Sequence, residues 1–226
     1  MSRAAEHGAA PDRESAPGDA PRRRAAGALL AAEAARFASL GWMRGTSGNL
    51  SVVLSRDPLR LAVTASGVDK GELGPDDIVV VDATGNPMPT GPGPGHGPAR
   101  KPSAEAPFHA RVVGLTGAGA VVHVHTVAAV VAGQRWPDGI ALTGLEMLKG
   151  IGLPAERETV TLPVIGNSQD MSELGDRLEQ VCDPRVPAVV IAGHGLYAWG
   201  ADPMQARHHT EIVQWLLEYS LAAGPR

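Results

Sequence analysis

The chain has 226 residues, is 43% hydrophobic and carries 20 basic and 24 acidic side chains, which gives a formal net charge of −4. This length and composition fit one large domain with a core of its own, and the negative balance argues against a nucleic-acid or anionic-membrane partner. No apolar run approaches the ~18 residues of a transmembrane helix, and the N-terminal region lacks the apolar segment of a signal peptide. The one cysteine, Cys182, excludes an intrachain disulfide framework. We expect a soluble, cytoplasmic protein.

Two segments differ in composition from the rest of the chain. Residues 1–24 combine Ala, Pro, Gly and charged residues without periodicity, which predicts a disordered tail. Residues 85–100, GNPMPTGPGPGHGPAR, are rich enough in Gly and Pro to predict a mobile loop. The expected folded domain is therefore residues 25–226, with this loop inside it.

Between these segments, helical periodicity alternates with short apolar runs typical of strands. The predicted helices cover residues 25–40, 103–113, 126–133, 141–150, 172–181 and 203–222. The predicted strands cover residues 50–54, 61–64, 78–82, 120–125, 159–164 and 187–192, with 197–199 extending the last region. Helices that interleave with strands predict a single-domain α/β fold with α/β/α layers. Tight turns between the early strands favour a mostly antiparallel or mixed central sheet.

Three histidines lie where predicted strands end. His123 and His125 close the apolar run that begins at residue 120, and side chains two apart on a strand point to the same face. His194 follows the apolar run 188–192 and is flanked by two glycines. Two strand ends that deliver three imidazoles are typical of an open catalytic zinc site, whose fourth position is left for water or substrate. We predict one Zn²⁺ per chain, although such ligands also bind other divalent first-row metals.

Six motifs occur in the order found in the class II aldolase/adducin-head superfamily. They are GTSGNLSV (45–52), TASGVDKGEL (64–73), KPSAEAPFH (101–109), VVHVHT (121–126), EMLKG (146–150) and GHGLYAWG (193–200). The chain resembles this superfamily from about residue 28 to residue 221. The third, fifth and sixth motifs point to its dehydratase branch. The resemblance implies a zinc-dependent lyase that removes water from a small phosphorylated ketose.

Two glutamates are candidates for acid/base chemistry. In dehydratases similar to this chain the glutamate of the EMxKG segment is the general acid/base, which here is Glu146. In aldolases of the superfamily the glutamate of the SxE segment lies beside the metal, and Glu105 matches it. We therefore expect Glu146 to be the main base and Glu105 a carboxylate close to the metal. His109, on the same helical face as Glu105, is expected to be packed rather than a fourth ligand.

A phosphate site is predicted from three small, hydroxyl-bearing turns. Backbone N–H groups at glycine turns and helix N-termini, together with hydroxyls, bind phosphate dianions. From the resemblance and the turns themselves, the predicted contacts are Ser47, Gly48, Asn49, Ser66, Gly67, Lys101 and Ser103. Ala104 stands where relatives often carry a small polar residue, so one phosphate hydrogen bond is expected to be missing.

Two other functions are compatible with the motifs. A class II aldolase that cleaves a short sugar phosphate, of the fuculose or ribulose phosphate type, is the nearest one, and EMLKG at 146–150 argues against it. A non-catalytic interaction module, as in adducin heads, would not need three metal-binding histidines. Relatives of this kind are tetramers, and the aromatic residues Trp199, Trp215 and Tyr219 near the C-terminus are typical of interface cores. We therefore expect a homotetramer.

Overall fold

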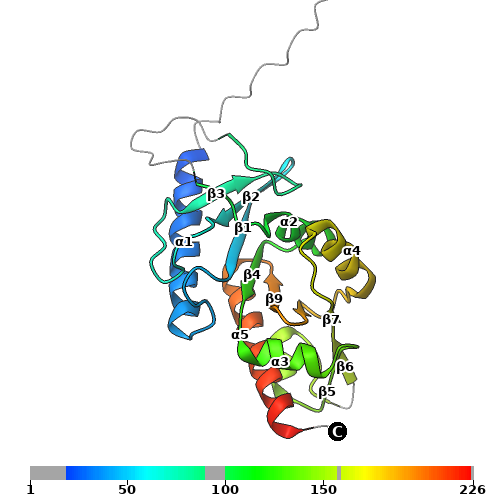
Figure 1. Ribbon diagram of the computed structural model, residues 1–226. Helices are drawn as coiled ribbons and strands as arrows, with labels where there is room; N and C mark the ends of the chain where they lie inside the picture. Colours follow the sequence, from blue (N-terminus) through cyan, green and yellow to red (C-terminus); the bar gives the residue numbers. More distant parts are fainter. Residues whose placement is uncertain (1–18, 90–99, 157–158, 225–226) are drawn as a thin grey trace, which may run out of the picture.

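The computed structural model describes residues 19–89, 100–156 and 159–224 (Figure 1). The helices are α1 (Asp19–Ser39), α2 (Ala106–Thr116), α3 (Val127–Arg135), α4 (Met171–Val181), α5 (Pro203–Ala223) and the short 3₁₀ helix η1 (Glu146–Ile151). The strands are β1 (Asn49–Arg56), β2 (Leu59–Thr64), β3 (Ile78–Val81), β4 (Ala120–Val124), β5 (Ile140–Thr143), β6 (Thr159–Leu162), β7 (Val164–Ile165), β8 (Ala188–Ile191) and β9 (Gly195–Gly200). Most of the predicted tail and residues 90–99 of the predicted loop lie outside the described residues.

Seven of the described strands form one sheet in the order β3-β2-β1-β4-β9-β8-β7. Every neighbouring pair is antiparallel except β7 with β8, so the sheet is mixed. β4 lies in the middle, between β1 and β9. The register aligns Asn49 with His123 and His123 with Tyr197, so these three residues stand in one row across the sheet. A separate two-stranded sheet is formed by β5 and β6.

Helices cover both faces of the large sheet (Figure 1). On one face, α2 and α4 contact each other over a core that includes Phe108 and Leu178. On the other face, α1, α3 and α5 enclose a larger core that includes Phe37 and Leu216 and continues into the two-stranded sheet. Each such fully buried side chain contributes about 1.5–3 kcal/mol of transfer free energy. The predicted α/β/α fold with a mixed central sheet is confirmed.

The chain departs from the predicted elements in two places near the N-terminal half. Helix α1 begins at Asp19, so residues 19–24, which we expected in the tail, are helical. Helix α2 begins at Ala106, three residues later than predicted, because Pro102 pairs with Ala65 in an isolated bridge and keeps the preceding segment extended. The remaining predicted helices and strands agree with the structure to within a few residues, apart from the region between α3 and α4.

The helix predicted over residues 141–150 is wrong. Ile140 and Leu142 alternate inward in β5, and Gly144, at φ +66°, turns the chain before η1 begins. The strand predicted over residues 159–164 is divided at Pro163, with β6 in the small sheet and β7 in the large one. A proline has no N–H to donate to a ladder, which is why the strand changes sheet there.

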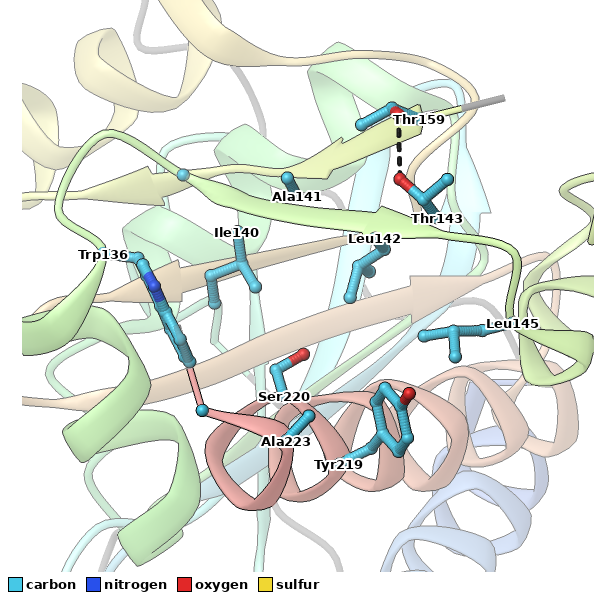
Figure 2. A pocket seen from close by; sticks show the side chains of 12 residues that line it. Trp136, Ile140, Ala141, Leu142, Thr143, Leu145, Thr159, Tyr219, Ser220 and Ala223 are labelled. Carbon is cyan, nitrogen blue, oxygen red and sulfur yellow. Dashed lines mark hydrogen bonds between the residues drawn. The ribbon is translucent and has the colours of Figure 1, made fainter. Parts of the chain in front are cut away.

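The β5–β6 sheet and the C-terminal part of α5 border a groove of about 360 Å³ (Figure 2). Its walls include Trp136, Leu142 and Tyr219, and none of the predicted site residues lines it. Among the described residues, no helix combines the length and the apolar character needed to cross a membrane.

Candidate active site

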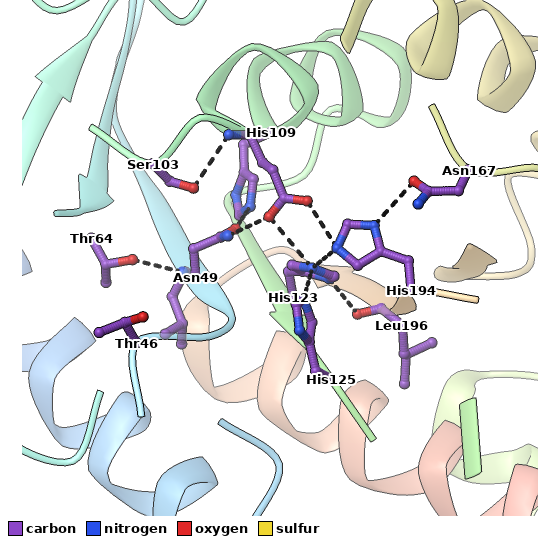
Figure 3. A network of polar contacts seen from close by, with 12 residues as sticks. Thr46, Asn49, Thr64, Ser103, His109, His123, His125, Asn167, His194 and Leu196 are labelled. Carbon is purple, nitrogen blue, oxygen red and sulfur yellow. Dashed lines mark hydrogen bonds and ion pairs between the residues drawn. The ribbon is translucent and has the colours of Figure 1, made fainter. Parts of the chain in front are cut away.

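Three histidines meet at the end of β4 (Figure 3). His123 lies in β4 and His125 follows the strand, so their spacing of two puts both rings on one face. His194 lies in the tight turn between β8 and β9, where Gly193 adopts φ +70°. The Nε2 atom of His123 is 2.7 Å from Nε2 of His125 and 3.2 Å from Nε2 of His194. The predicted convergence of these histidines is confirmed.

Hydrogen bonds behind the rings turn their Nε2 lone pairs toward a common point. Nδ1–H of His123 donates to the Leu196 carbonyl (3.1 Å), and Nδ1–H of His194 donates to Asn167 Oδ1 (3.3 Å). Since both partner atoms are oxygens that only accept, Nδ1 carries a proton in each ring and Nε2 is the nitrogen that faces the shared point. Burial, followed by the two neighbouring imidazoles, holds the pKa of His123 well below its usual value, and burial also lowers the pKa of His125.

This donor set fits a divalent metal ion. Tetrahedral zinc with Zn–N bonds of about 2.0–2.1 Å separates its nitrogen ligands by about 3.3 Å, and the 3.2 Å between the Nε2 atoms of His123 and His194 is close to this value. Three lone pairs that face one another at this distance repel unless a cation lies between them. The three histidines are therefore a candidate metal site, as predicted.

Glu105 lies on the fourth side of the cluster. Its Oε1 is 3.2 Å from His194 Nε2 and its Oε2 is 3.4 Å from His123 Nε2. The residue immediately precedes α2, and its side chain is 14% exposed. The prediction of a carboxylate near the metal position agrees with this geometry. The fourth side, which we expected to be open to water or substrate, is occupied by this carboxylate.

Glu105 is oriented by a chain of hydrogen bonds that runs through Asn49 and His109, the two residues labelled beside each other in Figure 3. Asn49 Nδ2 donates to Glu105 Oε2 (2.6 Å), and His109 Nε2–H donates to Asn49 Oδ1 (2.5 Å). Ser51 Oγ–H donates to Nδ1 of the same imidazole (2.7 Å). Burial lowers the pKa of His109 to about 4, so its ring is neutral. His109 is thus fully buried behind Glu105, with both of its ring nitrogens bonded to Ser51 and Asn49.

The three turns predicted to bind phosphate lie next to one another. The N–H of Ser66 donates to the Lys101 carbonyl (2.9 Å), which joins the second turn to the third. Lys70 Nζ donates to the Thr46 carbonyl (2.9 Å), which joins the second turn to the first. The first turn continues into Asn49, which contacts Glu105. The fold therefore brings all three turns to the side of the histidine cluster where Glu105 lies.

Individual residues of these turns differ in exposure and contacts. Gly48 is buried at φ +74°, and a Cβ there would lie 2.8 Å from the His123 carbonyl, so the first turn packs directly on β4. Gly67, also at φ +74°, is exposed. Ser47 Oγ donates to a carbonyl of its own turn, whereas Ser103 Oγ accepts the Glu105 N–H (3.3 Å). The Lys101 side chain is exposed, and phosphate binding by these residues stays a prediction.

Glu146 lies apart from this constellation. It begins η1, its side chain is 77% exposed, and Oε1 is 2.7 Å from Lys149 Nζ. Among the described residues, the other side chains that make polar contacts to these rings are Glu105 and Asn167. The catalytic role of Glu146 stays a hypothesis taken from the resemblance.

Sequence reasoning missed Asn167, Ser51 and Tyr197. The ring of Tyr197 is fully buried and stacks on the His123 ring, with centroids 4.0 Å apart and planes 12° from parallel. Burial, and after it the nearby Glu105 carboxylate, raise the pKa of its phenol well above the usual value. The strand register that aligns Tyr197 with His123 was not readable from spacing along the chain. A polar residue among apolar ones in β1 was the available signal for Ser51.

Comparison with known proteins identifies the family. The model of the class II aldolase and adducin N-terminal domain matches residues 28–221. The chain is 38% identical over 204 residues to methylthioribulose-1-phosphate dehydratase of Granulibacter bethesdensis, covering 87% of this chain and 91% of that protein. It is 36% identical over 181 residues to the enzyme of the same name from Persephonella marina, covering 79% and 81% of the two chains. The chain belongs to the class II aldolase and adducin family.

Solved structures show the same fold at lower identity. YgbL from Escherichia coli superposes with a TM-score of 0.73 at 20% identity, covering 90% of this chain and 92% of the other. L-fuculose-1-phosphate aldolase from Thermus thermophilus superposes with a TM-score of 0.62 at 23% identity, covering 89% and 94%. The mixed sheet with helices on both faces is thus the fold of class II aldolase structures.

Proposed function

We propose that this protein removes water from 5-methylthioribulose 1-phosphate and forms 2,3-diketo-5-methylthiopentyl 1-phosphate, a step of methionine salvage. The observation that carries the proposal is the cluster of three histidines, whose ligand nitrogens lie within 4.8 Å of one another, with the Glu105 carboxylate 3.2 Å from His194 Nε2 and three phosphate-type turns adjacent. The two dehydratases compared above support it, since their likeness spans about four fifths or more of both chains.

The reaction is the elimination of one water molecule across C3 and C4 of the substrate. The substrate has a carbonyl at C2 and hydroxyls at C3 and C4. Removal of the C3 proton and loss of the C4 hydroxyl as water leave an enol, which becomes a ketone at C3 when C4 is protonated. When bound, Zn²⁺ would supply positive charge that stabilises the negative charge on the C2 and C3 oxygens. His123, His125 and His194 would hold the ion as neutral ligands, which leaves its charge undiminished.

The protein's other residues bind and orient the substrate. The three turns described above would hold the phosphate, which fixes the distance from the anion to the reacting carbons. Asn49 holds Glu105 through a 2.6 Å hydrogen bond, so that carboxylate is oriented before substrate arrives. We propose Glu146 as the group that removes the C3 proton and returns one to the departing hydroxyl, a role worth roughly 10²–10⁴ in rate.

A second candidate function is favoured by one observation. Glu105, and not Glu146, contacts the histidine cluster, which is the arrangement that aldolases of the superfamily use for their acid/base glutamate. On this alternative the protein is a class II aldolase that cleaves a short sugar phosphate of the fuculose or ribulose phosphate type.

Product analysis separates the two functions. Purified zinc-loaded protein is incubated with methylthioribulose 1-phosphate or with fuculose 1-phosphate, and the products are identified by mass. We expect the first compound to lose the mass of one water molecule and the second to stay uncleaved. Cleavage of fuculose 1-phosphate with no dehydration of methylthioribulose 1-phosphate would establish the aldolase alternative.

We also propose a cytoplasmic homotetramer with one Zn²⁺ per subunit. Trp215 supports the assembly, because it is 41% exposed and stacks on Tyr219, with ring centroids 5.5 Å apart. Exposed aromatic side chains are enriched in interface cores. Trp199 does not contribute to this argument, since it is 7% exposed and lies in the chain's own core.

A further inference from the structure

Lys70 is a buried lysine beneath two of the glycine turns. It lies four residues beyond Ser66 in the second turn and is 1% exposed. Its Nζ donates to the carbonyls of Thr46 and Val68, each at 2.9 Å. Its backbone N–H donates to the Gly45 carbonyl (3.0 Å). One side chain thus fixes the position of the first turn relative to the second.

The charge of this ammonium is not balanced by a carboxylate. Within the described residues no carboxylate oxygen lies within ion-pair distance of Nζ, and the neighbouring Asp69 carboxylate accepts the N–H of Gly71 instead. Burial therefore lowers the pKa of Lys70, with Asp69 opposing the shift only in part. A lysine ammonium has three donors, and the two carbonyls use two of them. A buried ammonium that is hydrogen-bonded only to neutral carbonyls lowers the stability of the fold, and a nearby anion offsets this cost.

The surroundings of Lys70 indicate which kind of anion could balance its charge. The second turn exposes Ser66 and Gly67, and a Cβ added to Gly67 would meet no atom within 4 Å, so this turn faces open space. The carbonyl oxygens of Thr46 and Val68 accept hydrogen bonds from Lys70, which offsets their negative partial charge. Small exposed turns above a fixed positive charge are suited to a phosphate group.

We propose that Lys70 is a positioning residue for the substrate's phosphate, which it serves by clamping both glycine turns and by supplying positive charge beneath them. The proposal rests on the proposed function for the identity of the substrate, but its binding readout does not. Lys101, the exposed lysine of the third turn, adds at most a solvent-screened charge by comparison.

The test compares Lys70→Met, which removes the charge and the donors, with Lys70→Gln, which removes the charge but keeps two N–H donors on a side chain one atom shorter. Arg24→Met is the matched control, because the Arg24 side chain is 66% exposed on α1 and pairs with Asp76. Binding of inorganic phosphate to zinc-loaded protein is measured by titration calorimetry. We expect both Lys70 variants to bind phosphate about 10- to 100-fold more weakly, as for loss of a charged hydrogen-bond partner, and Arg24→Met to equal the wild type. Unchanged phosphate affinity in a folded Lys70→Gln protein would overturn the role of the charge.

Steady-state kinetics separate positioning from a merely structural effect. For methylthioribulose 1-phosphate, we expect KM to rise about tenfold or more while kcat changes little, and for methylthioribulose without phosphate we expect no change in kcat/KM. An equal loss for both substrates would mean that Lys70 is only structural. If wild-type protein binds phosphate through Lys70 but does not dehydrate the substrate, the proposed function fails and the Lys70 assignment stands.

The wild-type protein provides a measurement that does not depend on any variant folding. The chain contains three lysines, Lys70, Lys101 and Lys149, so lysine labelled at Cε gives few NMR signals. We expect inorganic phosphate to shift the Lys70 signal saturably and to leave that of Lys149 in place. No shift of the Lys70 signal at saturating phosphate would overturn the proposal.

Discussion

Replacing Gly195 by alanine tests whether the pairing of β4 with β9 fixes the metal ligands. Gly195 begins β9 directly after His194. A Cβ at this position would lie 2.4 Å from the Val124 carbonyl oxygen and 3.2 Å from ring atoms of both His123 and His125. The first contact is about 1 Å short of an ordinary van der Waals separation. Because the obstacle is backbone, the strands themselves must separate.

The expected effect has a stability part and a metal part. Overpacking of this kind costs about 1–3 kcal/mol of unfolding free energy. A zinc site tolerates changes of about 0.2 Å in its ligand distances, so a larger displacement of two imidazoles weakens binding by about 10- to 100-fold. Gly193→Ala is the matched control. Its φ of +70° costs an alanine about 1–2 kcal/mol, but no atom lies within 4 Å of the added methyl group.

Both variants and the wild type are compared by urea unfolding of the metal-free proteins and by zinc competition with a chromophoric chelator. We expect both variants to lose stability, but only Gly195→Ala to lose zinc affinity. If Gly193→Ala lost as much zinc affinity as Gly195→Ala, or if Gly195→Ala bound zinc like the wild type, the reasoning from strand separation would be refuted.

Four further predictions concern metal, chemistry, pH and assembly. The purified protein should contain about one zinc per chain, and alanine at any of the three histidines should remove most of it by elemental analysis, whereas full occupancy in the triple variant would exclude the site. Glu146→Gln should keep zinc and fold but lose turnover about 10²–10⁴-fold in the dehydration assay, and an active Glu146→Gln beside an inactive Glu105→Gln would assign the base to Glu105. His109 has a pKa of about 4 in the folded state, below its unfolded value, so it binds its proton less readily when the protein is folded. The free energy of unfolding should therefore fall by up to about 3 kcal/mol as pH is lowered from about 6.5 toward 4. The His109→Gln variant should lose less stability over that range, and an identical loss would contradict the buried, neutral state of His109. Light scattering should give about four times the chain mass of 23.3 kDa, and an active monomer would disprove the tetramer.

The periodicity of apolar residues predicted those helices and strands whose signal lies within their own sequence. The helices α3, α4 and α5 were found because the spacing of their apolar residues carries the signal. The region between α3 and α4 was not, since Ile140–Thr143 and the 3₁₀ turn after it share an apolar content that suits a helix equally well. There the pairing of β5 with β6, a tertiary contact, decides the structure.

The residues of the candidate site also fall into those that the sequence predicted and those that only the tertiary structure revealed. His123 and His125 could be assigned to one face from their spacing alone, and His194 from its place after an apolar run. The hydrogen bonds of Asn49 and Asn167 could not be foreseen, because they depend on strand register and on where β7 enters the sheet. Glu105 was matched by motif, but its position across the fourth side of the cluster required the geometry of α2 relative to β4.

The central position of β4 has a consequence for how this protein acquires its metal. β4 pairs with β1, about 70 residues earlier, and with β9, about 75 residues later, and His123 meets His194 across 71 residues. Contacts of such long sequence separation form late in folding, because loop closure must come first. The histidine cluster therefore depends on two long-range strand pairings and not on a local turn. We expect metal uptake to follow pairing of these strands, so that bound metal reports a folded central sheet.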